Sequence, residues 1–250
     1  MIDIHTHILP YVDDGAENFD EAYDMAVMAV RCGIRALVST PHSNHDVGFK
    51  NYESEQLRSL FGKLKNILKD ERVPLQIFRG MEVWTSTDIV DRLARKELLT
   101  LNGTRYVLIE FAFDEEIWWI EAVLRELLEA GYLPIIAHPE RYYSVQEHPN
   151  LLYEWRKQGA FAQMNKGSLF GRFGKGAEYA ANILLRHNLF NCIASDAHHS
   201  YIRTTDMTEL KRYMDRHYSI EQRVLLLEQN PRLILEGRAL RKVEKYSRID

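Results

Sequence analysis

Histidine and carboxylate residues recur just after short apolar segments of this 250-residue chain. His5 and His7 follow the first segment with one residue between them, so a strand would present both imidazoles on the same face. Six of the seven apolar segments end in, or are followed by, a side chain of this type. The other members of the set are His42, Glu82, Glu110, His138, Asp196 and His198.

Imidazole and carboxylate groups in combination are ligands for divalent ions such as Mn, Fe, Zn and Co. Any one of these residues alone is more typical of a structural hydrogen bond, but the joint pattern predicts a metal site. The set is too large for one ion, whereas two or three ions that share bridging carboxylates would use all of it. Closely spaced divalent ions generate a hydroxide nucleophile and stabilise the attacking and leaving oxygens of a phosphoryl transfer. We therefore predict a metal-dependent hydrolase of phosphate esters.

Two aspartates follow the first pair of histidines. Asp13 and Asp14 would lie in the loop after the first strand, on the same side as His5 and His7. One of these carboxylates is a candidate metal ligand. The other explanation is an N-terminal cap for the following helix, where carboxylates are favourable. From the residues alone, both roles stay open, one for each aspartate.

Apolar segments with strand character alternate with segments of helical period. The predicted strands span residues 2–4, 34–39, 75–78, 106–111, 133–137, 161–164 and 190–194. The predicted helices span residues 18–32, 53–69, 117–130, 151–158, 178–187, 205–217 and 220–228. Such alternation implies parallel strands with helices packed outside them.

Seven strand–helix units fit a barrel better than an open sheet, and functional residues in such barrels lie at the C-terminal ends of the strands. The histidines and carboxylates occupy that place in the predicted order of elements. No linker rich in Pro, Gly and Ser divides the chain, so we predict one α/β domain over residues 1–237. Residues 238–250 are basic and lack apolar periodicity, which predicts a solvated tail of open function.

Charge and hydropathy exclude other classes. The formal net charge is -4, which does not favour a nucleic-acid partner. No apolar stretch is long enough to span a bilayer, and the N-terminus lacks the pattern of a signal peptide, so we expect a cytoplasmic protein.

The two cysteines do not fit a thiol phosphatase. Cys32 and Cys192 form no C-x-x-C pair, which indicates a reducing compartment. A cysteine phosphatase needs an arginine a few residues after its nucleophile, but Val38 and His198 stand at that distance. Both cysteines are therefore predicted to pack in the core.

Several motifs together carry a family resemblance. The opening segment 1–10 and the following Asp13-Asp14-Gly15 resemble the polymerase-and-histidinol-phosphatase (PHP) superfamily. More closely, the chain resembles the manganese-dependent protein-tyrosine phosphatases of bacterial capsule and exopolysaccharide operons. The resemblance covers roughly residues 1–235. Its further motifs are Ser39-Thr40-Pro41-His42, Gly80-Met81-Glu82, Leu108-Ile109-Glu110-Phe111, Ile136-Ala137-His138-Pro139-Glu140-Arg141, Ala194-Ser195-Asp196-Ala197-His198 and Asn230-Pro231.

The resemblance implies a distorted (βα)7 TIM-like barrel, the PHP fold, that holds three divalent ions. Manganese is the expected metal, with Fe, Zn, Co or Mg as alternatives. The implied ligands are His5, His7, Glu82 and Asp196 for the first ion, Glu82 as a bridge with Glu110 and His138 for the second, and Asp14, His42 and His198 for the third. Arg141 is implied as the group that binds substrate phosphate, and Arg203, shortly after the last ligand, is a second candidate.

The resemblance also implies the activity, a protein-tyrosine phosphatase that hydrolyses phosphotyrosine by a metal-activated hydroxide. Its partner would be a bacterial tyrosine kinase with a tyrosine-rich tail that controls capsular or exopolysaccharide synthesis. One alternative is a small-molecule phosphatase of the same superfamily, such as one acting on histidinol phosphate. The other is a metal-binding module without turnover. The metal in the cell, the phosphoprotein and the oligomeric state stay open.

Two segments after strands have open roles. Trp118 and Trp119 either flank the phosphotyrosine ring or pack in the core. Residues 166–176 are rich in glycine and basic residues, and are either a lid that contacts phosphopeptide or a connector with solvated charges. His199 directly follows His198, and the spacing of Asp196 to the last ligand favours His198.

Overall fold

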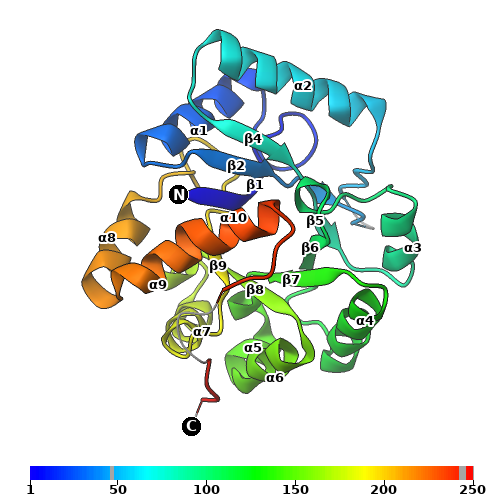
Figure 1. Cartoon of the computed structure of the whole chain (residues 1–250), viewed down its shortest axis with the longest axis vertical. Helices are drawn as coiled ribbons and strands as arrows, with labels where there is room; N and C mark the ends of the chain where they lie inside the picture. The colour runs from blue at the N-terminus through cyan, green and yellow to red at the C-terminus, as the bar shows by residue number, and fades with distance from the viewer. Residues whose placement is uncertain (46–47, 242–245, 250) are drawn as a thin grey trace.

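Short strands that all pair in parallel form the centre of the molecule (Figure 1). The computed structural model describes residues 1–45, 48–241 and 246–249. In that part of the chain the strands are β1 Ile2–Thr6, β2 Ala36–Ser39, β3 His42–Ser43, β4 Gln76–Arg79, β5 Glu82–Trp84, β6 Tyr106–Glu110, β7 Leu133–Ala137, β8 Phe161–Asn165 and β9 Cys192–Ala194.

The strands close into a distorted barrel. One sheet has the order β1-β2-β4, and the other has the order β3-β5-β6-β7-β8-β9. A parallel bridge between Thr6 and Ala197 joins β1 to the segment just after β9. β3 and β5 continue β2 and β4 after breaks at Pro41 and Gly80. Pro41 lacks an N–H group, and a Cβ at position 80 would lie 2.8 Å from a Leu101 methyl.

The predicted fold is therefore confirmed, with its second and third strands each split in two. The helices are α1 Phe19–Arg31, α2 Glu55–Asp70, α3 Ile89–Ala94, α4 Ile117–Glu129, α5 Tyr143–Glu147, α6 Asn150–Gln158, α7 Lys175–Arg186, α8 Thr208–His217, α9 Ile220–Val224 and α10 Asn230–Leu235. Sequence periodicity missed α3, α5 and α10, which are too short to show it. It also merged α9 with the π-helical turn Leu225–Gln229 that follows. None of the described helices combines the length and apolar character needed to cross a bilayer.

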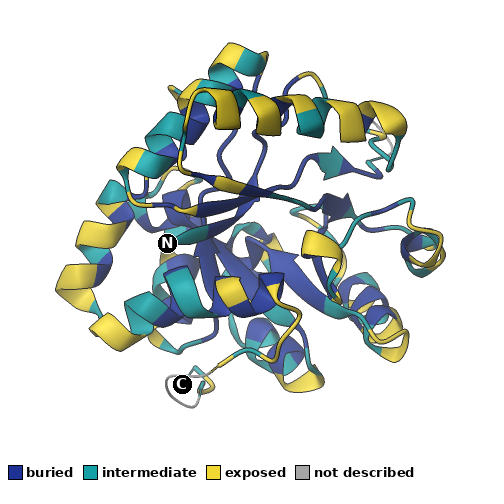
Figure 2. Ribbon diagram, turned by 45° about the horizontal axis from the view of Figure 1, so that its top comes forward, coloured by how far each residue is buried: buried dark blue, intermediate teal, exposed yellow. Residues whose placement is uncertain are grey.

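Two apolar cores lie on the two sides of the barrel wall. The outer core is built from the buried faces of the helices and the outward faces of the strands, while the opposite helix faces are exposed (Figure 2). The inner core fills the barrel and includes Ile4, Val38, Leu108 and Ala194. Ile234 of α10 belongs to this inner core, so α10 covers the end of the barrel away from the carboxyl ends of the strands (Figure 1).

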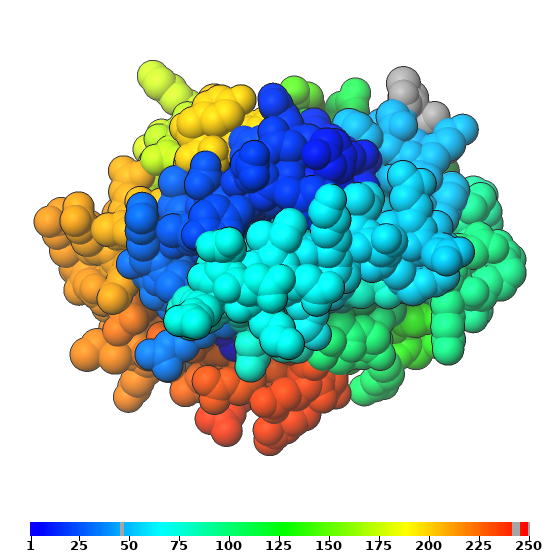
Figure 3. All heavy atoms as spheres, turned by 90° about the horizontal axis from the view of Figure 1, so that it is seen from above, coloured from blue at the N-terminus to red at the C-terminus, as the bar shows by residue number. Residues whose placement is uncertain are grey.

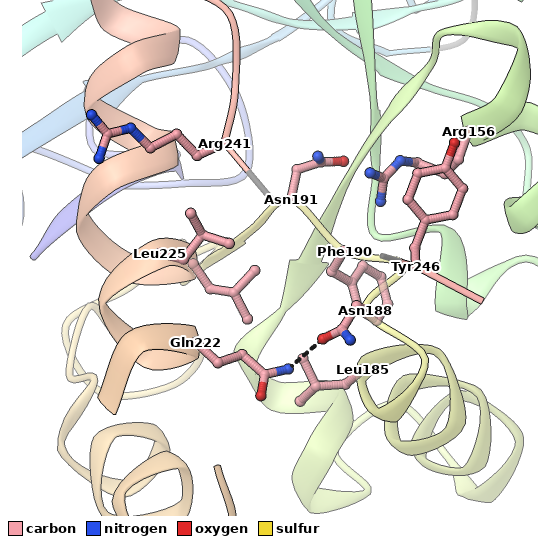
Figure 4. Close-up of a pocket in the computed structure, with 10 residues that line it drawn as sticks. Arg156, Leu185, Asn188, Phe190, Asn191, Gln222, Leu225, Arg241 and Tyr246 are labelled. Atoms are coloured by element: carbon pink, nitrogen blue, oxygen red, sulfur yellow. Dashed lines mark hydrogen bonds between the residues drawn. The ribbon is translucent and has the colours of Figure 1, made fainter. Parts of the chain in front are cut away.

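The described part of residues 238–250, the segment predicted as a solvated tail, packs in part against the apolar cores, with Leu240 against the inner one. Tyr246 and Ile249 pack against the outer core. The Arg156 guanidinium lies 4.7 Å from the centre of the Tyr246 ring, and the two residues line the same small cavity (Figure 4). At about 20 Å³ that cavity has room for little more than one water molecule. Residues 242–245 and 250 lie outside the described part of the tail.

Candidate metal centre

A bulge in β1 presents two histidines to the barrel interior. The pairing of β1 with β2 shifts register between Asp3 and Thr6, so β1 holds one extra residue. Ile4 belongs to the inner core, yet the next side chain, His5, also faces inward. Bulges re-aim side chains in this way next to functional sites. His5 and His7 thus share one face, as their spacing predicted.

The Glu82 carboxylate lies at the centre of the cluster, at the start of β5. Its Oε2 atom is 3.1 Å from His5 Nε2, 3.2 Å from His7 Nε2 and 3.0 Å from His42 Nδ1. Its Oε1 atom is 3.0 Å from His138 Nε2. Four imidazoles from β1, β3 and the end of β7 therefore converge on one buried carboxylate.

The remaining predicted ligands border the same cluster. Ligand atoms within 4.8 Å of one another form three groups: His5, His7, Glu82 and Asp196; His7, Asp14, His42 and His198; and His42, Glu82 and Glu110. His138 lies outside these groups, with its Nε2 atom 3.6 Å from Glu110 Oε1. The structure thus brings all nine predicted ligands together at one mouth of the barrel.

The two neighbouring aspartates have different places. Asp14 Oδ1 lies 3.5 Å from both His42 Nε2 and His198 Nε2. Asp13 instead accepts hydrogen bonds from the His7 ring and from the backbone N–H groups of His42 and Gly15. The cap of α1 is Asn18, so neither aspartate has the capping role that sequence left open.

His199 also has a place of its own. Its Nδ1 atom lies 3.2 Å from Glu21 Oε1 on α1, outside the cluster. His198 is the histidine that reaches Asp14, which agrees with the Asp-x-His spacing.

The tautomers of His5 and His7 indicate that the cluster fits cations. His5 Nδ1 is 2.9 Å from Gln163 Oε1 and His7 Nδ1 is 2.8 Å from Asp13 Oδ2, so each ring donates its Nδ1–H group to an acceptor outside the cluster. The two Nε2 atoms then present lone pairs, 3.2 Å apart, to the neighbouring carboxylates. Lone pairs that face one another repel unless a proton or a metal ion lies between them. The donor set therefore fits metal ions.

Burial and charge shift the pKa values of the cluster. Burial alone would raise the pKa of Glu82 and of Asp196, but neighbouring imidazoles, His5 first, hold both values well below the usual range. Burial raises the pKa of Glu110 to about 8, and repulsion from Glu82 adds to this effect. Burial lowers the pKa of His138 to about 4. Burial also acts to lower the pKa of His5, His7 and His42, but neighbouring carboxylates raise it above the usual value. Glu82, Asp196 and His138 thus favour the deprotonated forms that bind metal, whereas Glu110 and these three imidazoles must release a proton.

Two arginines lie at the mouth of the cluster. The Arg141 guanidinium is 4.3 Å from the centre of the Phe113 ring and 4.4 Å from that of Phe173. Arg203 Nη2 donates a hydrogen bond of 2.6 Å to Asp196 Oδ2. Both guanidiniums line an open cavity of about 410 Å³. The cavity is large enough to take a small ligand.

Sequence reasoning missed several residues that hold the ligands. Asn165 donates a 2.6 Å hydrogen bond to Asp196 Oδ2. Glu140 Oε1 accepts from the Asn165 N–H and the Ser168 hydroxyl. Gln163 orients His5. The polar positions 163 and 165, in a strand whose neighbours are apolar, were the available signal.

The two segments with open roles are now placed. Trp118 is 67% exposed and Trp119 packs against the outer core, and neither lines the cavity. Residues 166–170 form a buried 3-10 turn rather than a solvated connector. Phe173 from the same segment contacts Arg141, so this segment does border the site. Burial raises the pKa of the Cys192 thiol far above its usual value, and Cys32 is half-buried, as expected for core packing.

The fold and the site together define an α/β-barrel protein with a candidate metal centre at the carboxyl ends of its strands. Residues 1–236 match the family described as capsular polysaccharide synthesis, CpsB/CapC. The chain belongs to this CpsB/CapC family, which confirms the resemblance seen in its motifs.

Individual relatives cover almost the whole chain. The tyrosine-protein phosphatase YwqE of Bacillus subtilis is 39% identical over 240 residues, which are 96% of this chain and 93% of YwqE. The tyrosine-protein phosphatase CpsB of Streptococcus pneumoniae is 31% identical over 240 residues, which are 94% of this chain and 98% of CpsB. A crystal structure from work on these two proteins, described as unique metal-dependent tyrosine phosphatases, matches with a TM-score of 0.90 at 36% identity and covers 100% of both chains. The lactonase Lmo2620 of Listeria monocytogenes, at 12% identity, a TM-score of 0.59 and coverage of 96% of this chain and 95% of the lactonase, shares the fold alone.

Proposed function

We propose that this chain is a metal-dependent protein-tyrosine phosphatase. The observation that carries the proposal is the convergence of nine imidazole and carboxylate side chains, five of which line the same open cavity as two arginines. The names of YwqE and CpsB, which match the chain over nearly its full length, support the same activity. The complete donor set and the arginines speak against a module that binds metal without turnover.

Three divalent ions, manganese first, are the proposed cofactors. The ligands are those that the resemblance implied: His5, His7, Glu82 and Asp196; Glu82, Glu110 and His138; and Asp14, His42 and His198. Divalent ions at such a site supply Lewis acidity, which makes water acidic near neutral pH and neutralises charge on phosphoryl oxygens. Fe, Zn and Co suit the same ligand types, so metal availability contributes to the choice.

The residues of the chain bind and orient the substrate. Arg141 is held between two aromatic rings with its guanidinium toward the cavity, where its planar fork matches two phosphate oxygens. Arg203 adds a second positive charge, with its Nη2 atom 2.6 Å from the Asp196 Oδ2 atom that Arg141 also approaches. Phe49, Trp84 and Phe113 line the cavity and provide apolar walls for a tyrosyl ring. A phenolate, with a pKa of about 10, leaves more readily than an alkoxide, so no strong general acid is required.

The proposed substrate is a phosphotyrosine protein, in particular a bacterial tyrosine kinase with a tyrosine-rich tail that acts in capsular or exopolysaccharide synthesis. Membership of the capsular polysaccharide synthesis family supports this partner. A kinase tail of this kind is cytoplasmic, and we propose the same location for this chain.

Parallel turnover of a phosphotyrosyl peptide, histidinol phosphate and p-nitrophenyl phosphate tests the proposal. We expect manganese-dependent hydrolysis of the peptide and of p-nitrophenyl phosphate, lost with a chelator and restored by manganese. Faster turnover of histidinol phosphate would instead identify a small-molecule phosphatase. Full activity in the presence of excess chelator would contradict metal dependence.

A further inference from the structure

Most of the large apolar side chains that the described part of the chain exposes lie in segments that follow the carboxyl ends of strands, with Trp118 and Tyr143 in the first turns of α4 and α5. These are Tyr11 after β1 (62% exposed), Trp118 after β6 (67%), Tyr143 after β7 (58%), and Tyr201 and Ile202 after β9 (72% and 58%). Because the strands are parallel, all of these segments begin at the same end of the barrel, the one formed by the carboxyl ends of the strands. We call these five residues the mouth rim.

The mouth rim is continuous with the cavity. The Tyr143 N–H donates to the carbonyl of Phe113, which lines the cavity, and Tyr143 stands two residues after Arg141. The Tyr201 ring stacks on His199 at 5.2 Å, beside the last candidate ligand. In Figure 3 the blue N-terminal segment and the yellow segment near residue 200 lie side by side along one edge of the molecule.

We propose that the mouth rim docks the polypeptide on both sides of the substrate's phosphotyrosine, an inference that rests on the proposed function. A cavity of about 410 Å³ takes one side chain, so the polypeptide that carries it must cross the loops around the opening. Tyrosine and tryptophan are enriched in protein interfaces, and clustered exposure of such residues marks interaction sites. A free phosphotyrosine makes none of these contacts.

The test compares substrates of different size. In the variant Trp118→Ser/Tyr201→Ser, kcat/KM for a phosphotyrosyl peptide with flanking residues on both sides falls about tenfold, through KM. The value for p-nitrophenyl phosphate stays the same, because that molecule does not reach the rim. The matched control is Ile220→Ser, which removes an equally exposed side chain (71%) at the start of α9 and changes neither substrate.

Equal losses on both substrates, or no loss on the peptide, overturn the docking surface. Light scattering tests whether a second copy of the chain occupies the mouth rim instead of substrate. A dimer that dissociates in the Trp118→Ser/Tyr201→Ser variant would show this, and would also overturn the proposal. Absence of turnover in the unsubstituted chain with manganese contradicts the proposed function itself, and so is distinguishable from failure of the docking surface.

A second observation concerns a buried ammonium group. Lys166 follows β8 and is only 4% exposed. Its Nζ atom donates to the carbonyls of Thr204, at 2.5 Å, and Asp206, at 2.6 Å. Between them, the Thr205 hydroxyl donates to the Met25 carbonyl of α1 at 2.7 Å. The loop after β9 is thus held by two sets of hydrogen bonds, one from Lys166 and one from Thr205 to α1.

The loop that these hydrogen bonds hold contains Arg203. This residue has a φ of 47°, a left-handed conformation that needs support from its surroundings, and its carbonyl accepts from the His198 N–H. We infer that Lys166 is a positioning residue that holds the Arg203 guanidinium toward Asp196 and the cavity. Lys166 does not itself line the cavity, because its ammonium group is used by the two loop carbonyls.

A double-mutant cycle tests this coupling. Lys166→Met and Arg203→Ala should each raise KM for the phosphotyrosyl peptide about tenfold, and the double variant should be no worse than Arg203→Ala alone. Bound manganese per chain should stay unchanged, and Lys166→Arg should restore part of the loss. If Lys166→Met does not fold, Thr205→Val, which removes the hydrogen bond from the loop to the Met25 carbonyl, should reproduce the KM effect. Multiplicative losses in the double variant, or a loss in kcat alone, overturn the assignment.

Discussion

At the scale of single residues, Arg141 has the geometry of an anion receptor. Its guanidinium is stacked between Phe113 and Phe173 and is 16% exposed, with Nη1 3.7 Å from Asp196 Oδ2. An arginine that acted only through its charge would not need two aromatic rings beside it. A planar guanidinium that must keep a fixed orientation toward a ligand does need them.

Replacing Arg141 by lysine keeps the positive charge but removes the planar fork of the guanidinium. We expect kcat/KM for p-nitrophenyl phosphate to fall about tenfold or more in Arg141→Lys, mainly through KM, since one of two charge-assisted hydrogen bonds is lost. Steady-state kinetics with saturating manganese measure the effect. An unchanged KM and kcat would remove Arg141 from the phosphate site.

Glu140 is a buried acid whose protonation links stability to pH. Its Oε1 atom accepts two hydrogen bonds, its Oε2 atom has no partner, and burial raises the pKa of its carboxyl to about 7. Between the ordinary value and pH 7 the folded chain therefore binds a proton that the unfolded chain has lost. The free energy of unfolding should fall as pH rises through this window.

The variant Glu140→Gln removes this dependence. We expect the wild type to lose about 3 kcal/mol relative to Glu140→Gln between pH 4 and pH 8, a bound that follows from roughly 1.4 kcal/mol per pKa unit. Urea unfolding of both chains at several pH values gives the difference. Parallel pH profiles for the two proteins would mean that Glu140 is already ionised in the fold.

At the scale of elements, the turn after β1 sets the cluster. A Cβ at Gly15 would lie 2.1 Å from the His7 carbonyl oxygen and 2.5 Å from the His7 Cβ. Both contacts are to atoms that cannot move without shifting β1. Asp13, which orients the His7 ring, is in the same turn, and its Oδ1 would lie 2.9 Å from the added atom.

Gly15→Ala should therefore lower manganese affinity at least about tenfold and destabilise the fold by ~2 kcal/mol or more, as expected for backbone overlap. The control is Gly62→Ala in the middle of α2, where an added Cβ meets nothing within 4 Å and should stabilise the chain by ~0.5–1 kcal/mol. Isothermal titration and thermal melts compare the two. Normal metal binding by Gly15→Ala would show that the turn adapts.

Periodicity was sufficient to predict the strands and longer helices, because their apolar residues repeat with the period of the element. It did not predict the bulge in β1, since a bulge depends on pairing with β2. Pro41 and Gly80 can be read from the sequence as residues that break a strand. Only the pairing with neighbouring strands shows that β3 and β5 continue the barrel after these breaks. The packing of α10 into the inner core was likewise invisible to local pattern.

The candidate ligands could be predicted because chemistry restricts their types and strand ends restrict their places. Their supporting residues could not. Gln163, Asn165 and Lys166 act through partners that lie far away along the chain, His5, Asp196 and the loop at residues 204–206. The residues alone did not separate Asp13 from Asp14, whereas the family resemblance implied Asp14, the one of the two that lies beside His42 and His198.

At the scale of the whole molecule, the cluster joins the first strand of the barrel to the segment after its last strand. Candidate ligands from β1 and from the loop after β9 lie in one group, in which the ligand atoms are within 4.8 Å of one another. Divalent ions that bind only the folded chain should therefore stabilise it.

Manganese should raise the melting temperature of the chelator-treated protein, with a gain that grows with metal concentration. Calorimetry over a manganese series measures it, and Asp196→Ala, which removes a shared ligand, provides the matched control with little or no gain. An equal shift in both proteins would place the stabilising ion elsewhere.

The most direct test of the account is anomalous diffraction from crystals of the active protein prepared with manganese. The account predicts strong anomalous peaks among the histidine and carboxylate atoms of the barrel mouth, bridged by Glu82, and no activity after the peaks are removed by chelation. A fully active crystal without peaks at this cluster, or with ions bound only elsewhere, would contradict it.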